Sequence, residues 1–261
     1  MKNLIFTLFI ATVLYSSCSK EESVANTTIP PVGSIKRISE TTFYNGTART
    51  YGADFNYENV QLKSLNGGSI GSFELVMEGN KIVQTKSIVN NAVSDANNIT
   101  YEGNNLKLIQ QGDGSEKTEY NYINDQLASE PSSYSTNGGS FVLSALNSYT
   151  FNSNQNIASK ILSFYQGINS SFKSGFDYDN KNSVFKNMNP YLKFLFNFES
   201  LDIKSNNNVL KQFSHSTPTA NDSTQSHYYT IIYNDNNFPI SVKKHRFGNN
   251  ELISECTISY N

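Results

Sequence analysis

The sequence predicts an all-β fold: a long antiparallel meander of hairpin repeats that forms a curved or rolled sheet, with at most one or two short helices. Two observations support this prediction. From Ser34 onward, apolar and polar residues mostly alternate, which is the pattern of half-buried strands. Asn, Asp, Gly and Ser interrupt the alternation every few residues, as tight turns require. The clearest strands are 73–77, 229–233 and 256–260.

A repeated unit connects the expected strands. An aromatic or large apolar residue ends one strand, a few turn residues follow, and an apolar residue begins the next strand. The unit runs from Tyr57 to Leu62, Met77 to Ile82, Tyr101 to Leu106, Tyr122 to Leu127, Phe151 to Ile157, Tyr178 to Val184 and Tyr233 to Phe238. Asn, Asp and Gly tolerate the left-handed backbone of hairpin turns. A spacing of roughly 20 to 30 residues is typical of repeat architectures, although any all-β chain also alternates strands and turns.

Helical spacing is confined to two segments. In 189–196, Asn189 is a suitable N-cap and Pro190 fits a first helical turn. The segment 157–164 is the second candidate. A basic cluster at 243–246 is predicted to protect an exposed strand edge from pairing with another chain.

The first 17 residues form an export signal. Lys2 supplies a positive start, Leu4 to Tyr15 is apolar, and Ser16 and Ser17 are small residues suited to cleavage. The apolar run is shorter than the roughly 20 residues of a membrane-spanning helix. We therefore expect residues 1–17 to be removed rather than to anchor the protein.

Cys18 indicates how the mature protein is held. The sequence Leu14-Tyr15-Ser16-Ser17-Cys18 resembles the lipobox of bacterial lipoproteins, with Tyr15 where that pattern prefers Leu. The resemblance implies that the Cys18 thiol receives a diacylglyceryl group, whose fatty acids palmitate would label, and several acyl chains hold a protein stably at a membrane. The alternative is an ordinary secretory leader with an incidental cysteine.

The residues after the cysteine indicate a location. Lys20, Glu21 and Glu22 resemble the export signal of Bacteroidota lipoproteins, which directs them to the outer face of the outer membrane. A periplasm-facing anchor is the alternative. Residues 18–33 then form a lipidated Cys and flexible tether, and residues 34–261 form a single β-repeat domain.

Charge and cysteine content exclude some functions. Removal of residues 1–17 takes away Lys2 and no acid, so 19 basic and 22 acidic side chains leave a formal charge of −3. This balance argues against nucleic-acid binding.

Once Cys18 is lipidated, only Cys256 remains, so no intrachain disulfide forms. Cys256 is expected to be a buried apolar residue rather than a reactive thiol.

The sequence contains no strong catalytic, cofactor-binding or metal-binding motif. Gly67-Gly68-Ser69-Ile70-Gly71 matches the pattern of a nucleophile elbow, but a strand rather than a helix is expected after it. His215, His227 and His245 lack the spacing of metal ligands. Asp222-Ser223-Thr224 resembles the Bacteroidota O-glycosylation signal, which makes Ser223 a candidate modification site.

The hairpin units also suggest a family. They resemble the Tyr-Asp repeats of bacterial surface proteins, and 176–187 resembles a segment of Bacteroidota surface lipoproteins that carry a meandering β domain. This resemblance implies no activity. We therefore predict a lipid-anchored surface lipoprotein with a non-catalytic binding or structural role, no cofactor, and a surface protein or glycan as partner. The alternatives are a glycan-capturing module of an uptake system and a glycan hydrolase with dispersed carboxylates.

Overall fold

The computed structural model describes residues 33–261 apart from 59, 68–71, 136–139, 166–169, 203, 218–219 and 222–225. The described strands, in chain order, are β1 (Ile35–Tyr44), β2 (Thr47–Glu58), β3 (Gln61–Asn66), β4 (Ser72–Glu78), β5 (Lys81–Val89), β6 (Ala92–Glu102), β7 (Asn105–Gln111), β8 (Glu116–Glu119), β9 (Asn121–Ile123), β10 (Gln126–Ser135), β11 (Phe141–Phe151), β12 (Ile157–Phe164), β13 (Ser170–Tyr178), β14 (Val209–Thr217), β15 (Ala220–Asn221), β16 (His227–Tyr233), β17 (Pro239–Arg246) and β18 (Leu252–Tyr260). Among the described residues, the only helix is the 3-10 turn η2 (Leu192–Phe194). None of the described helical structure is long and apolar enough to cross a membrane.

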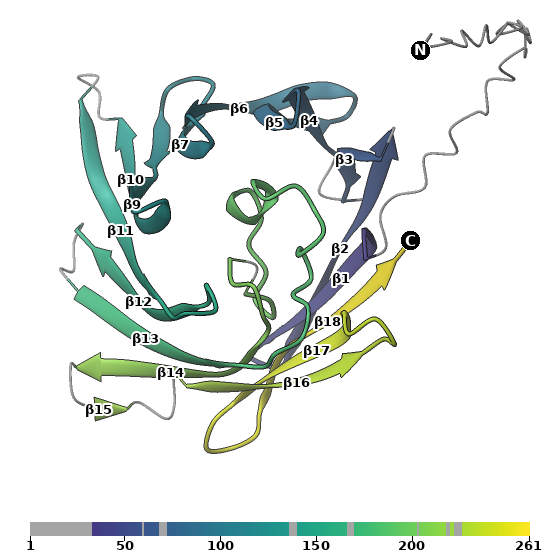
Figure 1. Ribbon diagram of the computed structural model, residues 1–261, viewed down its shortest axis with the longest axis vertical. Coiled ribbons are helices and arrows are strands. Elements are labelled where there is room, and N and C mark those ends of the chain that lie inside the picture. The colour runs from purple at the N-terminus through teal and green to yellow at the C-terminus, as the bar shows by residue number, and fades with distance from the viewer. Residues whose placement is uncertain are drawn as a thin grey trace, which may run out of the picture.

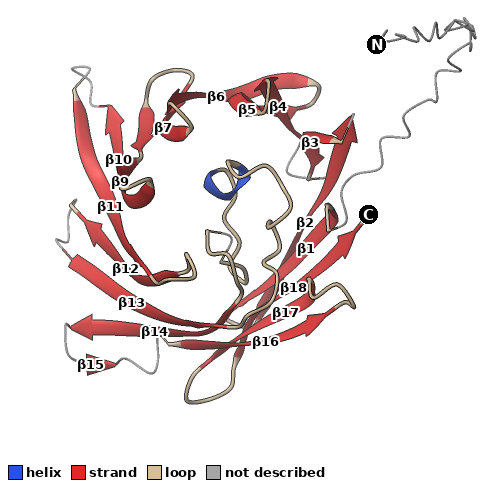
Figure 2. Cartoon of the chain, in the orientation of Figure 1, coloured by secondary structure: helices blue, strands red, loops and turns tan. Residues whose placement is uncertain are grey.

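The strands close into a barrel (Figures 1 and 2). Neighbouring strands pair antiparallel, and β1 pairs both with β2 and with β18, where Ile35 lies opposite Tyr260. Strands β8 and β9 both pair with β10, and the two-residue β15 lies beside β14, so the closed ring has 16 strands. The all-β prediction is confirmed, but the predicted curved or rolled open sheet is wrong. Closure leaves no free edge along the ring, and it depends on pairing between the two ends of the domain.

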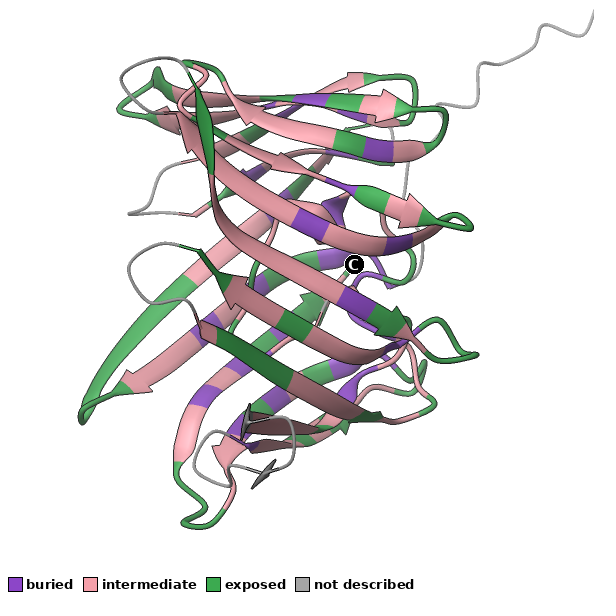
Figure 3. Cartoon of the chain, turned by 90° about the vertical axis from the view of Figure 1, so that its left-hand side faces the viewer, coloured by how far each residue is buried: buried purple, intermediate pink, exposed green. Residues whose placement is uncertain are grey.

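The two faces of the barrel wall differ in polarity. The inner face carries the buried apolar residues Ile38, Phe55, Leu65, Leu75, Ile82, Ile99, Leu106, Leu127, Ile157, Val242 and Ile258. The outer face carries polar cross-strand pairs: Arg37–Asp54, Thr41–Thr50, Gln84–Asn98, Thr150–Ser159 and Ser163–Ser171. Much of the wall seen from the side is accordingly intermediate or exposed (Figure 3). The alternation of apolar and polar residues along each strand therefore gives the barrel an apolar interior and a polar, solvent-exposed outer face.

A long connection fills the interior. We call residues 179–208, between β13 and β14, the plug; it lies inside the ring in Figures 1 and 2. Its aromatic rings pack on one another and on the wall, with Phe185 and Phe196 stacked at 6.1 Å between centroids and Phe196 6.3 Å from Phe55. Leu192 in η2 is fully buried. A barrel of this size requires such filling to exclude water from its apolar inner face.

Side chains of the plug bind the hairpin turns at one rim of the barrel. Asn182, Asn189 and Asn206 donate to the carbonyls of Asn236, Asn80 and Asn154, and Tyr191 donates to that of Asn104, at 2.7–3.1 Å. We call this end the plugged rim and the opposite end the far rim. The start of β1 and the end of β18 also lie at the plugged rim: the Asn261 amide donates to the Ser34 carbonyl at 2.9 Å, and Tyr57, beside the β2–β3 turn, donates to the Ile35 carbonyl. The plug thus joins turns from four separate hairpins.

The predicted repeat units lie at the plugged rim, where several of their tyrosines make one type of contact. Within the units, Tyr57 and Tyr101 donate their hydroxyls to the carbonyls of Ile35 and Ile82, which lie at the start of the preceding strand, at 2.8 and 2.7 Å. Tyr260, which ends β18 outside the predicted units, makes the same contact with the Pro239 carbonyl at 2.8 Å. Gly79, Gly103 and Asn237 adopt positive φ in the adjoining turns. A tyrosine before the turn can therefore tie its own strand to the start of the preceding one, whereas the hydroxyls of Tyr178 and Tyr233 donate to Asp202 and Asp179 of the plug.

Three local predictions are corrected. The segment 157–164 is strand β12 rather than a helix, because its backbone pairs with β11 on one side and with β13 on the other. The segment 189–196 forms only η2, although Asn189 Oδ1 does accept the Tyr191 amide at 3.0 Å. The basic cluster 243–246 lies on β17, between β16 and β18, so it protects no free edge.

Candidate functional site

A pocket lies between the plug and the wall formed by β1 to β4. Its volume is about 360 Å³, within the range typical of small-molecule sites. It is lined by Ile38, Glu40, Tyr51, Gly52, Ala53, Leu65, Gly67, Phe73, Leu195, Phe196, Asn197 and Phe198. The lining is largely aliphatic and aromatic, with Glu40 as its one ionisable carboxyl group. We call this space the plug–wall pocket.

Strand register explains why the pocket exists. Ile38 lies opposite Ala53 and Leu65 lies opposite Phe73, so the inner faces of β1 to β4 present a continuous apolar row. The small side chain of Ala53 leaves a gap in that row. On the plug side, Phe196 and Phe198 pack 6.3 Å apart and hold the opposite wall of the pocket. The pocket is therefore bounded by paired strands on one side and by packed aromatic rings of the plug on the other.

The Glu40 carboxylate fastens the plug above the pocket. It is 8% exposed and accepts the amides of Ser200 at 2.7 Å and Glu199 at 3.2 Å. Ser200 also forms a hydroxyl contact with Ser254 at 2.7 Å. Because both carboxylate oxygens already accept hydrogen bonds, the role of Glu40 in this arrangement is to position the plug.

Cys256 lies opposite Glu40 in the pairing of β1 with β18. The thiol is fully buried, and burial, followed by the Glu40 charge, raises its pKa above that of a free cysteine. A buried thiol with a raised pKa has little thiolate, which is the reactive form. The prediction that Cys256 is a buried apolar residue is confirmed.

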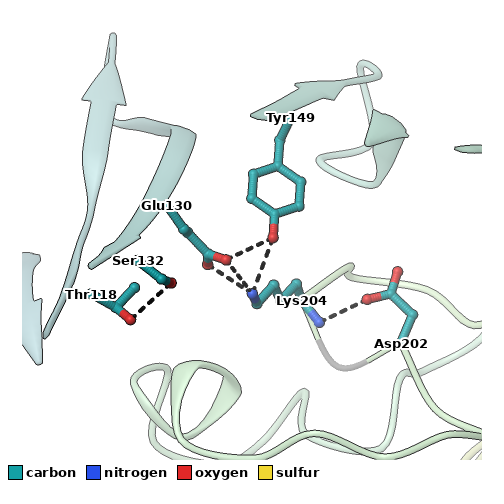
Figure 4. A network of polar contacts seen from close by, with 6 residues as sticks. All are labelled: Thr118, Glu130, Ser132, Tyr149, Asp202 and Lys204. Atoms are coloured by element: carbon teal, nitrogen blue, oxygen red, sulfur yellow. Dashed lines mark hydrogen bonds and ion pairs between the residues drawn. The ribbon is translucent and has the colours of Figure 1, made fainter. Parts of the chain in front are cut away.

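A second polar centre joins the plug to the wall formed by β10 and β11 (Figure 4). The Lys204 ammonium donates to both oxygens of Glu130 at 2.7 and 2.8 Å, and the Tyr149 hydroxyl donates to Glu130 at 2.7 Å. Glu130 is 4% exposed. Asp202 accepts the Lys204 amide at 3.0 Å. The buried carboxylate is thus paired and hydrogen-bonded, which is the condition for keeping a charge inside a protein.

The three histidines do not share one site: His227 and His245 lie one position apart in the β16–β17 ladder, so their side chains point to opposite faces of the sheet. His215, His227 and His245 lie opposite Lys173, Arg246 and Tyr228 in the ladders of β14, β16 and β17. Burial, followed by the charge of Lys244, lowers the pKa of His227 to about 4. Within the described part of the chain, no group of three or more His, Cys, Asp or Glu residues could hold a metal ion.

The other predicted site residues lie outside the described residues. These are Cys18, Lys20, Glu21, Glu22, Ser223 and the Ser69 of the elbow-like segment. The exposed tyrosines, Tyr44, Tyr51 and Tyr165, lie on both sides of the barrel and form no continuous row. The plug–wall pocket was not visible in the sequence, because its residues come from β1 to β4 and from a segment more than a hundred positions later.

Comparison with known proteins finds similarity in structure only. No protein-family model matches this chain, and no curated protein sequence matches it. It is similar to a porin-like protein from Bacteroides vulgatus, with 12% identity, a TM-score of 0.48, and coverage of 87% of this chain and 98% of that chain. It is also similar to a porin-like protein from Bacteroides uniformis, with 8% identity, a TM-score of 0.47, and coverage of 88% and 98%. A likeness of this strength assigns no activity to this chain.

Proposed function

We propose that this protein is a lipid-anchored, non-catalytic binding protein of the outer membrane. Its barrel lies outside the bilayer, in the aqueous phase, and binds an apolar ligand in the plug–wall pocket. The observation that carries the proposal is the pocket itself, which is about 360 Å³ and lined mainly by aliphatic and aromatic side chains. Sites of this size and polarity bind small apolar molecules or single acyl chains.

The polarity of the wall supports a barrel outside the bilayer. A membrane-spanning barrel presents an apolar band about 25 Å tall to the lipid and a polar interior. Here the outer face carries the ion pair Arg37–Asp54 at 2.6 Å and that between Lys243 and Glu255 at 3.6 Å, and the interior is apolar. Inserting this wall into lipid would place charged pairs in hydrocarbon, which is costly.

The anchor is supported by the sequence alone. A lipid on Cys18, followed by Lys20, Glu21 and Glu22, would hold the chain at the outer membrane and direct it outward. The tether would join the barrel at Ser34, on the plugged rim. The plugged rim would then face the lipid, and the far rim would face away from it.

A binding role fits the buried polar groups better than catalysis does. Glu40 and Glu130 are already hydrogen-bonded to plug amides and to an ammonium group. In a glycan hydrolase, two carboxyl groups flank the scissile bond. The described buried carboxylates instead each hold the plug in place, so we place the function in the pocket.

The pocket is tested with the apolar fluorescent probe N-phenyl-1-naphthylamine. The mature chain should give a saturable rise in fluorescence, and Ala53→Phe, which fills the gap beside Ile38, should weaken binding at least tenfold. The matched control is Ala145→Phe on β11, across the barrel and opposite Ser132. Equal binding by wild type and Ala53→Phe would exclude the pocket as the binding site.

The anchor is tested by palmitate labelling of cells. Label should enter the wild type and Cys256→Ala and should be absent from Cys18→Ala. Incorporation by Cys18→Ala would show that the lipidation assignment is wrong. Protease treatment of intact cells then tests orientation, because a surface-facing domain is degraded and a periplasm-facing one is protected.

A further inference from the structure

A second cavity lies within the plug and opens at the plugged rim. It measures about 120 Å³ and is lined by Ser183, Phe185, Lys186, Met188, Asn189, Pro190, Lys193, Lys204, Ser205 and Asn206. Three of these residues are lysines and none is an acid. Lys186, Pro190 and Asn206 are exposed and mark its mouth, whereas Ser183 and Ser205 are buried. We call this space the lysine cavity.

The three lysines differ in how their charge is compensated. Lys204 is paired with Glu130, and Lys186 donates to Asn182 Oδ1 at 2.7 Å. The Lys193 ammonium has no hydrogen-bond acceptor among the described residues, and it lies 5.3 Å from the centroid of the Phe194 ring. Burial, followed by the charge of Lys204, lowers the pKa of Lys193. Among the described residues, the Lys193 ammonium therefore has no directly bonded anion, in contrast to Lys204.

The neighbouring charged residues do not neutralise the excess positive charge of the cavity. Lys160 is shifted in the same direction by burial and by Lys204, and both amines also sense the charges of Glu130 and Asp202. Lys160, Lys193 and Lys204 thus act on the same two carboxylates, and Glu130 is already hydrogen-bonded through both oxygens to Lys204. An anion in the lysine cavity would balance the remaining charge.

We infer that the lysine cavity is a binding site for a small oxyanion, a phosphate group being the chemistry that fits best. The cavity measures about 120 Å³, which is room for about four water molecules and enough for one tetrahedral oxyanion. Lys193 and the free N–H groups of Lys186 would donate to it, as ammonium groups do to phosphates. The mouth opens at the plugged rim, where the proposed tether joins the barrel, so the phosphate could be a free ion or a lipid headgroup.

The proposal is tested by thermal unfolding of the mature chain in inorganic phosphate, with chloride replaced at constant ionic strength. Phosphate should raise the Tm of the wild type in a saturable way. Lys193→Gln should bind phosphate at least tenfold more weakly, and the matched control Lys173→Gln, an exposed lysine on β13, should respond like the wild type.

Two further measurements separate binding from folding. Without phosphate, Lys193→Gln should melt at the same or a higher temperature than the wild type, because an unpaired ammonium has been removed. A lower Tm combined with an unchanged phosphate response would overturn the proposal, as would a wild type that does not respond to either anion source. Ala53→Phe should keep the phosphate response, which makes the test independent of the plug–wall pocket.

The same thermal unfolding experiment with dihexanoyl phosphatidylglycerol, below its critical micelle concentration, identifies the source of the phosphate. A response to inorganic phosphate at equal or lower concentration assigns the site to a free oxyanion. A response to the lipid at a concentration at least tenfold lower assigns it to a headgroup at the membrane surface.

Discussion

The two rims of the barrel are built differently. At the plugged rim, the turns are bound by plug side chains such as Asn182 and Asn189, and tyrosines such as Tyr57 satisfy backbone carbonyls. At the far rim, large apolar residues remain accessible: Phe164 is 40% exposed and Phe172 is 50% exposed, although their rings pack 6.3 Å apart.

The contrast shows where the stability of this barrel resides. Burial of apolar area and satisfied polar groups stabilise the plugged half, while the far half has hairpins with less to pack against. The plug–wall pocket lies where the plug meets the wall, so one side of the proposed binding site is formed by the best-packed part of the protein. Four substitutions test this contrast.

The largest effect is expected from breaking the buried ion pair. Lys204→Met leaves the Glu130 carboxylate without its ammonium partner, which should cost about 3–5 kcal/mol of unfolding free energy, measured by urea denaturation. Lys211→Met, at an exposed position on β14, is the control and should change stability by less than about 0.5 kcal/mol. A further Glu130→Leu change should recover much of the loss, since no unpaired buried charge then remains. A loss under about 1 kcal/mol for Lys204→Met would show that the pair does not secure the plug.

The next effect tests packing. Leu192→Ala removes a fully buried side chain from η2 and should cost about 3 kcal/mol through the cavity it leaves. The comparison at the far rim is Val142→Ala, where the side chain is 38% exposed and the expected loss is below about 0.5 kcal/mol. Comparable losses at both positions would mean that the two ends are equally packed.

The strands and turns of the plugged rim could be predicted because both signals are local. Alternation marks each strand, and the aromatic residue, the amide-rich turn and the following apolar residue lie within a few positions of one another. Closure could not be predicted, because it requires Ile35 to pair with Tyr260 and no local pattern records that contact. The partners of the basic residues 243–246 could not be predicted either, because they lie far away in the sequence. Lys244 points into the barrel and pairs with Glu199, whereas Lys243 points outward and pairs with Glu255.

The plug and both candidate sites were missed for a related reason. The unit at Tyr178 to Val184 was expected to be another hairpin, but the chain passes into the interior instead. The sequence did contain one signal of a buried connection. The Phe residues between 185 and 198 are more numerous than a solvent-exposed loop requires. The pairing of Glu130 with Lys204 joins positions 74 apart, which no spacing rule identifies.

The far half should also respond to pH. The pKa of His227 is about 4 in the folded state against an ordinary value of 6.5, because burial and the charges of Lys244 and Arg246 outweigh Glu199. Between these values the unfolded chain binds more protons, so stability should fall as the pH falls from about 6.5 to about 4. With a discount for partial exposure, the loss should be on the order of 1–2 kcal/mol. Urea titrations should show a flatter profile for His227→Gln and an unchanged one for His215→Gln. An unchanged profile for His227→Gln would assign the acid sensitivity to other groups.

The smallest effect separates two contributions at the plugged rim. Tyr101→Phe keeps the ring that packs 4.7 Å from Tyr191 but removes the hydroxyl that donates to the Ile82 carbonyl at 2.7 Å. We expect a loss of about 1 kcal/mol, the usual net value of one such bond, against no measurable change for the exposed Tyr165→Phe. If Tyr101→Phe is neutral, the aromatic residue before each turn acts through its ring alone, and Met77 and Phe151 at equivalent positions are full substitutes. If the loss is found, the tyrosine units carry a hydrogen bond that the Met and Phe units lack, and the turns that follow Tyr57 and Tyr101 should exchange their amide hydrogens more slowly than those that follow Met77 and Phe151.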